Sequence, residues 1–205
     1  MHSTSIVASD ELIEHVPEAG SFGLSSDTPR AGSSTGPWLA VGVVAVYVIL
    51  TILVFLPVSP WDPHSLPVCN CADYAKMTSY LAWTPFALLH GQNIFFTNYQ
   101  DYPYGVNLAG NTNIPLLGIL MAPVTLTAGP IAAMNLVAHI GVASSAASAY
   151  FVLRRYVSYW PAAFTGGLLY GFSPYVMAHA HGHPNLIFVP LLPVLVLLAD
   201  EVLIR

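Results

Sequence analysis

The amino-acid sequence predicts an all-α polytopic membrane protein with about four transmembrane helices, a re-entrant or interfacial helix and a long first external loop. Composition is the first reason: hydrophobic residues make up 55% of the 205 residues and charged residues only 7%, against about 25% charged in ordinary soluble domains. The second is that uncharged apolar segments long enough to cross a bilayer recur along the chain. So few charges could not cover the surface of a water-soluble domain of this size.

Residues 1–36 differ from the rest and are expected to form a disordered cytoplasmic tail. They carry five of the ten carboxylates against one arginine, and Ser, Gly, Thr and Pro dominate residues 20–37, which is typical of flexible segments. The tail lacks the basic start and apolar run of a secretory signal peptide. Residues 37–205 form the predicted transmembrane domain, and the absence of a basic patch in the sequence disfavours nucleic-acid binding.

Four segments are predicted to cross the membrane. The first runs uncharged for 20 residues from Trp38, which is placed as an interfacial anchor, and at about 1.5 Å per residue it matches the ~30 Å hydrocarbon core. The second is rich in Ala, Gly and Ser, which allow close helix approach, and the third is loosened by Gly166, Gly167 and Gly171. The four predicted spans are residues 38–57, 131–153, 160–177 and 185–203.

The segment between the first two spans is expected to remain largely outside the bilayer core. Residues 58–113 contain several prolines and four charged residues, which predicts the long external loop. Within it, residues 74–90 fit a helix that lies in the interface and is interrupted by Pro85, and residues 93–113 an ordered extended loop. Residues 114–128 are apolar for only 15 residues and contain two prolines, which suits a re-entrant helix.

The arginines support this count through the positive-inside rule. If residues 114–128 do not cross, then Arg30, Arg154, Arg155 and Arg205 all lie on the cytoplasmic side. If that segment crosses, Arg154 and Arg155 fall outside. We therefore expect a multi-pass protein of the plasma membrane with both termini in the cytoplasm and the lipid bilayer as its surroundings.

Under this topology two external segments, the long loop and the turn at residues 175–185, meet at one membrane face. Their carboxylates and imidazoles can perform acid–base or metal-assisted chemistry, although for any one of them an ordinary solvated loop residue is the more frequent case. These candidates are Asp62, His64, Asp73, Lys76, His90, Asp101, His179, His181 and His183.

The histidines and the two cysteines are residue types that can ligate a metal ion. The three histidines of the turn line up on an extended chain and three imidazoles can hold zinc, but no carboxylate ligand lies near them in sequence, so no metal site is assigned. Within the second span, His139 is expected to be a hydrogen-bonded interior residue. For Cys69 and Cys71, plain thiols, a strained disulfide and a redox or metal role remain open.

Several motifs follow one another in a particular order after residue 58. They are Asp73-Tyr-Ala-Lys-Met-Thr-Ser-Tyr-Leu-Ala-Trp83, His90-Gly-Gln-Asn, Tyr102-Pro-Tyr-Gly, Asn111-Thr-Asn-Ile-Pro and Gly171-Phe-Ser-Pro-Tyr. In this order they resemble the N-terminal part of actinobacterial membrane glycosyltransferases of the GT-C superfamily, which use polyprenyl-phosphate sugars outside the membrane.

The resemblance implies roles for individual residues. Asp73 matches the aspartate that acts as base on the acceptor hydroxyl or helps to bind a divalent cation, the one cofactor that the resemblance admits. Lys76 would approach the donor phosphate or pair with Asp73, three residues away. The other expected substrate-binding residues are Asp62, His90, Asp101 and His183.

Two classes of function follow. The first is a glycosyltransferase, or its N-terminal module, that moves a sugar from polyprenyl phosphate to an extracytoplasmic cell-envelope acceptor. Because enzymes of this kind have more spans and a C-terminal domain, the chain is expected to be a fragment, a truncated product or one half of an assembly.

The alternative is a non-catalytic subunit whose small-residue face, in residues 131–153, packs on a larger membrane protein. A transporter fragment is disfavoured by the lack of paired intramembrane charges.

The predicted topology places Tyr156 in the cytoplasm. In a protein with Cys69 and Cys71 replaced by serine, the variant Tyr156→Cys should react with a membrane-impermeant maleimide only after the cells are permeabilised, whereas Tyr102→Cys in the external loop should react in intact cells. Labelling is read by gel shift. Reaction of Tyr156→Cys in intact cells would overturn the four-span model.

Overall fold

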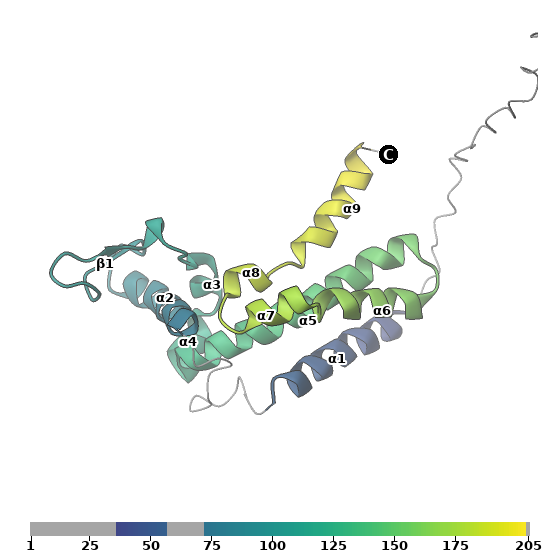
Figure 1. The fold of residues 1–205 in the computed structure, drawn as a ribbon, viewed down its shortest axis with the longest axis horizontal. Helices are drawn as coiled ribbons and strands as arrows, with labels where there is room; N and C mark the ends of the chain where they lie inside the picture. The colour runs from purple at the N-terminus through teal and green to yellow at the C-terminus, as the bar shows by residue number, and fades with distance from the viewer. Residues whose placement is uncertain (1–35, 57–71, 204–205) are drawn as a thin grey trace, which may run out of the picture. The chain divides into compact units, whose positions relative to one another are not determined.

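The computed structural model describes residues 36–56 and 72–203. The predicted N-terminal tail, Asp62, His64 and both cysteines lie outside the described residues. Of the described residues, 75% are helical, and three helical segments among them are long and apolar enough to cross a membrane, namely Pro37–Val54, Pro130–Tyr156 and Pro184–Leu203. This agrees with an all-α membrane protein (Figure 1).

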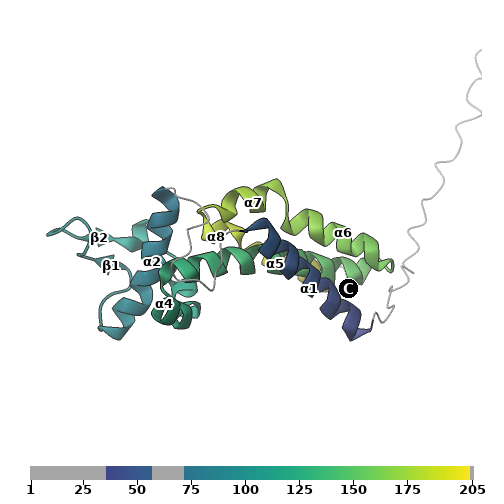
Figure 2. The same cartoon turned by 90° about the horizontal axis from the view of Figure 1, so that it is seen from below.

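The elements follow the chain in a simple order. They are α1 (Pro37–Val54), α2 (Ala72–Leu89), β1 (Phe96–Thr97), β2 (Val106–Asn107), a 3-10 turn (Leu108–Gly110), α3 (Pro115–Leu120), α4 (Ala122–Ala128), α5 (Pro130–Tyr156), α6 (Trp160–Gly171), α7 (Pro174–Ala180), α8 (Pro184–Ile187) and α9 (Leu191–Leu203). The longest, α5, has 27 residues and contacts α1, α2, α4 and α6–α9. Figures 1 and 2 show α1 and α6 lying along it.

The contact between α5 and α6 depends on glycine. A Cβ atom at Gly171 would lie 2.5 Å from the Cβ of Ala146 and 2.6 Å from its backbone nitrogen, and one at Gly167 would lie 2.6 Å from the Ala146 carbonyl oxygen. The two glycines are four residues apart and share one helix face, which is the spacing that lets membrane helices approach closely. They therefore tighten the packing of this helix, and the expectation that they loosen it was wrong.

The segment predicted as the third span, residues 160–177, is divided. Helix α6 ends at Gly171. Ser173 is the N-cap of α7, and its Oγ accepts a hydrogen bond from the Val176 amide at 3.4 Å. The physical reason is Pro174, because the residue before a proline is disfavoured in helical conformation. With 12 residues, α6 is about 18 Å long, which is less than a hydrocarbon core.

The segment predicted as the fourth span is also broken, between α8 and α9. Three carbonyls at the break accept hydrogen bonds from hydroxyl groups of α5 and α6. Ser145 Oγ donates to Ile187 O at 3.4 Å, Tyr170 Oη donates to Val189 O at 2.8 Å, and Ser148 Oγ donates to Pro190 O. At its other end α9 is joined to α5 by an ion pair of 2.8 Å between Arg155 and Glu201.

The segment after the first span follows the predicted outline with two differences. Residues 72–89 form one continuous helix, α2, with Pro85 inside it, so the expected interruption is absent. The apolar segment at residues 114–128 forms two short helices, α3 and α4, which meet at Met121. The expected extended loop contains an antiparallel hairpin with two residues in each strand, in which Phe96 pairs with Asn107.

Helix α2 is fixed to the N-terminal end of α5. The Tyr74 hydroxyl donates a hydrogen bond to Asn135 Oδ1, and a buried cluster that includes Met77, Leu81 and Met134 surrounds it. On α5 the small residues predicted to face a partner protein are used within the chain, because Ala146 lies against α6 and Gly141 against Ile187. Other small residues of α5, such as Ala143 and Ala147, remain partly exposed, and α9, none of whose residues is buried, offers a further surface to a partner helix.

The close α5–α6 contact predicts the response to added volume. Gly171→Ala should lower the free energy of unfolding by about 1–3 kcal/mol, because the new methyl group overlaps backbone atoms of Ala146. Gly42→Ala on α1 is the control, since no atom lies within 4 Å of its Cβ position; it should not destabilise the protein. Unfolding in detergent, followed by circular dichroism, measures both, and equal stability of the two variants would contradict the packing.

Candidate functional site

Asp73 lies in the first turn of α2, with its side chain 48% exposed. The N-terminal end of a helix favours a negative charge. Lys76 is one turn further along, and its Nζ donates to Asp73 Oδ1 at 2.9 Å, with the lysine side chain 37% exposed. The local ion pair expected from the three-residue spacing is therefore present.

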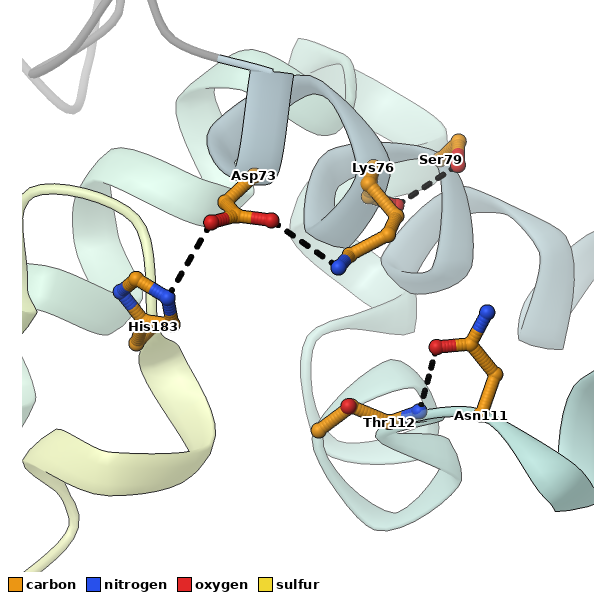
Figure 3. A network of polar contacts seen from close by, with 6 residues as sticks. All are labelled: Asp73, Lys76, Ser79, Asn111, Thr112 and His183. Atoms are coloured by element: carbon orange, nitrogen blue, oxygen red, sulfur yellow. Dashed lines mark hydrogen bonds and ion pairs between the residues drawn. The ribbon is translucent and has the colours of Figure 1, made fainter.

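The second carboxylate oxygen of Asp73 faces the histidine turn. His183, which precedes α8, places its Nε2 3.3 Å from Asp73 Oδ2. Both segments of the predicted external face thus meet at this pair, although 110 residues separate them in the sequence. Figure 3 shows Asp73 between Lys76 and His183, with one oxygen turned toward each.

The charge state of Asp73 follows from these contacts. The hydrogen bond from Lys76 and the lysine's positive charge lower the pKa of the Asp73 carboxyl below its usual value, and His183 adds a smaller effect in the same direction. The carboxylate is therefore ionised at neutral pH. Since protonation removes the charge that Lys76 binds, the contact is present at neutral pH and is lost as the pH falls through the pKa of Asp73.

Two other predicted site residues lie elsewhere. His90 follows α2, where its Nδ1 lies 2.8 Å from the Phe86 carbonyl and its ring stacks on Phe86 at 4.1 Å. The rise along α2 puts it about 25 Å from Asp73. Asp101 lies between β1 and β2, with a positive φ of 52°. Neither residue has a contact with the cluster of Asp73, Lys76 and His183, which we call the Asp73 cluster.

Three other histidines of the described residues each contact a carbonyl one helical turn earlier. The Nδ1 atoms of His179 and His181 lie 2.7 Å from the carbonyls of Tyr175 and Met177, one turn earlier. In residues 36–56 and 72–203 no group of three potential metal ligands comes together. His139 is buried and its Nδ1 lies 2.7 Å from the Asn135 carbonyl, as expected of an interior residue.

Sequence reasoning missed two neighbours of the Asp73 cluster. Ser79 donates to the Lys76 carbonyl at 2.7 Å, and Asn111 Oδ1 accepts from the Thr112 amide at 2.8 Å. Figure 3 shows the Asn111 amide group turned toward the side of α2 that carries Lys76 and Ser79. The motif that begins at Asn111 was visible in the sequence, but nothing in it indicated which helix it would face.

The chemistry available here is limited and specific. An ionised carboxylate can accept a proton, an exposed ammonium group can bind an anion, and an imidazole can hold the carboxylate in place. Comparison of the chain with protein-family models, with curated proteins and with solved structures found no match.

The electrostatics of the Asp73 cluster give a direct test. Lys76→Met should raise the pKa of Asp73, because the variant loses both the hydrogen bond and the charge that stabilise the carboxylate. Lys76→Arg keeps a cation and should retain a low pKa. Titration of the carboxyl carbon by nuclear magnetic resonance, assigned with Asp73→Asn, measures the change. An unaltered pKa in Lys76→Met would show that the ion pair does not form in solution.

Proposed function

We propose that this chain is a membrane glycosyltransferase module that moves a sugar from a polyprenyl-phosphate donor to an extracytoplasmic cell-envelope acceptor. The observation that supports it most is the exposed, ionised carboxylate of Asp73 held between Lys76 and His183. These three residues were singled out from the sequence for such a reaction, and the order of the motifs supports the same class of enzyme.

Asp73 acts as the general base in this proposal. The acceptor hydroxyl attacks the anomeric carbon of the donor sugar, so that a carbon–oxygen bond forms while the bond from that carbon to the phosphate oxygen breaks. The hydroxyl proton passes to Asp73, and polyprenyl phosphate leaves as the anion. A base positioned in this way typically contributes about 10²–10⁴ to the rate.

Lys76 binds the phosphate and thereby links donor binding to the strength of the base. In the chain without donor, Lys76 lowers the pKa of Asp73, which makes the carboxylate a weak base. A bound phosphate competes for the ammonium group, and the pKa of Asp73 then rises toward its ordinary value. The carboxylate thus becomes a stronger base when the donor is in place.

The other predicted residues have narrower roles. His183 donates a hydrogen bond from Nε2 to Asp73 Oδ2, so that Oδ1 takes the proton once the donor phosphate has drawn Lys76 away from it. His90 and Asp101, outside the Asp73 cluster, would contact only a distant part of an extended acceptor. A divalent cation, the alternative partner of Asp73, would have to displace Lys76 from Oδ1.

A second candidate function is a non-catalytic subunit that binds a larger membrane protein. The observation in its favour is α9, whose residues are all at least partly exposed, so that a helix of another protein has an apolar surface to cover. Co-purification of a larger membrane protein that is lost when leucines of α9 are replaced would favour this function.

The catalytic proposal predicts the effect of removing the base. Asp73→Asn should lower the rate of sugar transfer by about 10²–10⁴, because the amide has nearly the same shape but cannot accept the proton. Glu201→Gln, on α9 and outside the Asp73 cluster, is the matched control and should keep most of the rate. Transfer from a panel of radiolabelled polyprenyl-phosphate sugars to envelope acceptors is measured in membranes that contain the chain. Sugar transfer by Asp73→Asn at the rate of the unmodified protein would contradict the proposal.

A further inference from the structure

A pocket of about 600 Å³ lies along the C-terminal half of α2, beside α4 and the β1–β2 segment. Its walls include Tyr80, Trp83 and Phe86 from α2, Tyr99 from the loop, and Leu126 from α4. No Asp, Glu, Lys or Arg lines it, and none of the residues of the Asp73 cluster does. Its size lies within the range of small-molecule sites, and its lining favours an uncharged, largely apolar ligand.

Two residues of the pocket lining each have a buried polar atom without a hydrogen-bond partner. Trp83 Nε1 and Thr125 Oγ1 are buried, and neither makes a hydrogen bond to the described residues. A buried donor without an acceptor is costly and uncommon in folded proteins. Because an indole N–H can only donate, the ligand that would satisfy it carries an acceptor oxygen.

The surface around the pocket indicates where the ligand comes from. Leu89, Tyr99 and Leu126 belong to the lining and are 68%, 69% and 57% exposed. Tyr102 and Tyr104, in the same loop as Tyr99, are also largely exposed. Exposed leucines beside exposed tyrosines are typical of a surface at the boundary between acyl chains and headgroups.

We propose that this pocket binds a membrane lipid with ester-linked acyl chains. One chain fills the aromatic-walled space, and its ester carbonyl accepts a hydrogen bond from Trp83 Nε1 after the indole turns to uncover the N–H. Ester carbonyls lie at the same boundary that the exposed leucines and tyrosines mark. The proposal does not rest on glycosyl transfer, because Asp73, Lys76 and His183 lie outside the lining; His90, which was expected to bind substrate, belongs to the lining but is not used in the argument.

Other occupants fit less well. A polyprenyl chain offers no acceptor oxygen within its length, and its phosphate would find no cation in the lining. A free sugar would expose many hydroxyl groups to apolar walls that have few polar partners. The acceptor required by Trp83 therefore distinguishes an ester lipid from a hydrocarbon that merely fills the volume.

The test compares lipids that differ only in the carbonyl group. Native mass spectrometry of the full chain in detergent is used to titrate diester phosphatidylcholine, its diether analogue of equal chain length, and a polyprenol. The unmodified protein should bind the diester about fivefold more tightly than the diether, the difference expected for one neutral hydrogen bond. Equal affinity for diester and diether, or tighter binding of the polyprenol, would overturn the proposal without any variant.

Three variants locate the effect. Trp83→Phe keeps an aromatic ring but loses the N–H, so its diester affinity should fall to that of the diether. Trp160→Phe, outside the pocket lining, is the matched control and should keep the preference. Leu126→Trp adds volume to the lining and should weaken both lipids at least tenfold. Unchanged preference in Trp83→Phe, or unchanged binding in Leu126→Trp, would contradict the assigned site.

Discussion

Every backbone carbonyl inside an apolar medium must find a hydrogen-bond donor, and this requirement shapes the described part of the chain. Helix α5 is continuous and satisfies its own interior carbonyls, whereas the last apolar segment is broken between Ile187 and Leu191. Backbone amides of Val189 and Leu192 donate to the carbonyls of Ile187 and Val189 at that break. Hydroxyl groups add to them, because Tyr170 donates to Val189 O, Ser148 to Pro190 O and, more weakly, Ser145 to Ile187 O. The serines of α5, which in sequence look only like small packing residues, thus allow a neighbouring helix to be interrupted.

The same helix sets the geometry of the Asp73 cluster. Tyr74, next to Asp73, is bound to Asn135, and Ile187, at the end of the short helix that His183 begins, lies against Gly141. Asn135 and Gly141 are six residues apart on α5, a rise of about 9 Å. Two segments that are distant in sequence are therefore fixed to neighbouring turns of one helix, and this brings the carboxylate and the imidazole together.

The sequence predicted features that depend on local pattern. Apolar length located α1 and α5, and the three-residue spacing of Asp73 and Lys76 gave their ion pair. The predictions from sequence failed where packing between helices determines the structure. Pro85 lies inside a continuous α2, and two glycines of α6 allow a close contact with α5. Nor could the sequence show that His183 lies beside Asp73, or that Trp83 and Thr125 line one pocket, because these facts depend on contacts between distant segments.

Helix α9 has a consequence for how its conformation is maintained. It contributes no buried residue, and polar links to α5 lie near both of its ends, at Ser148–Pro190 and Arg155–Glu201. The second link is exposed to solvent, which weakens an ion pair. Most of the α9 surface therefore meets the surrounding medium, so that bilayer thickness, or the radius of a micelle, acts on its tilt together with the polypeptide.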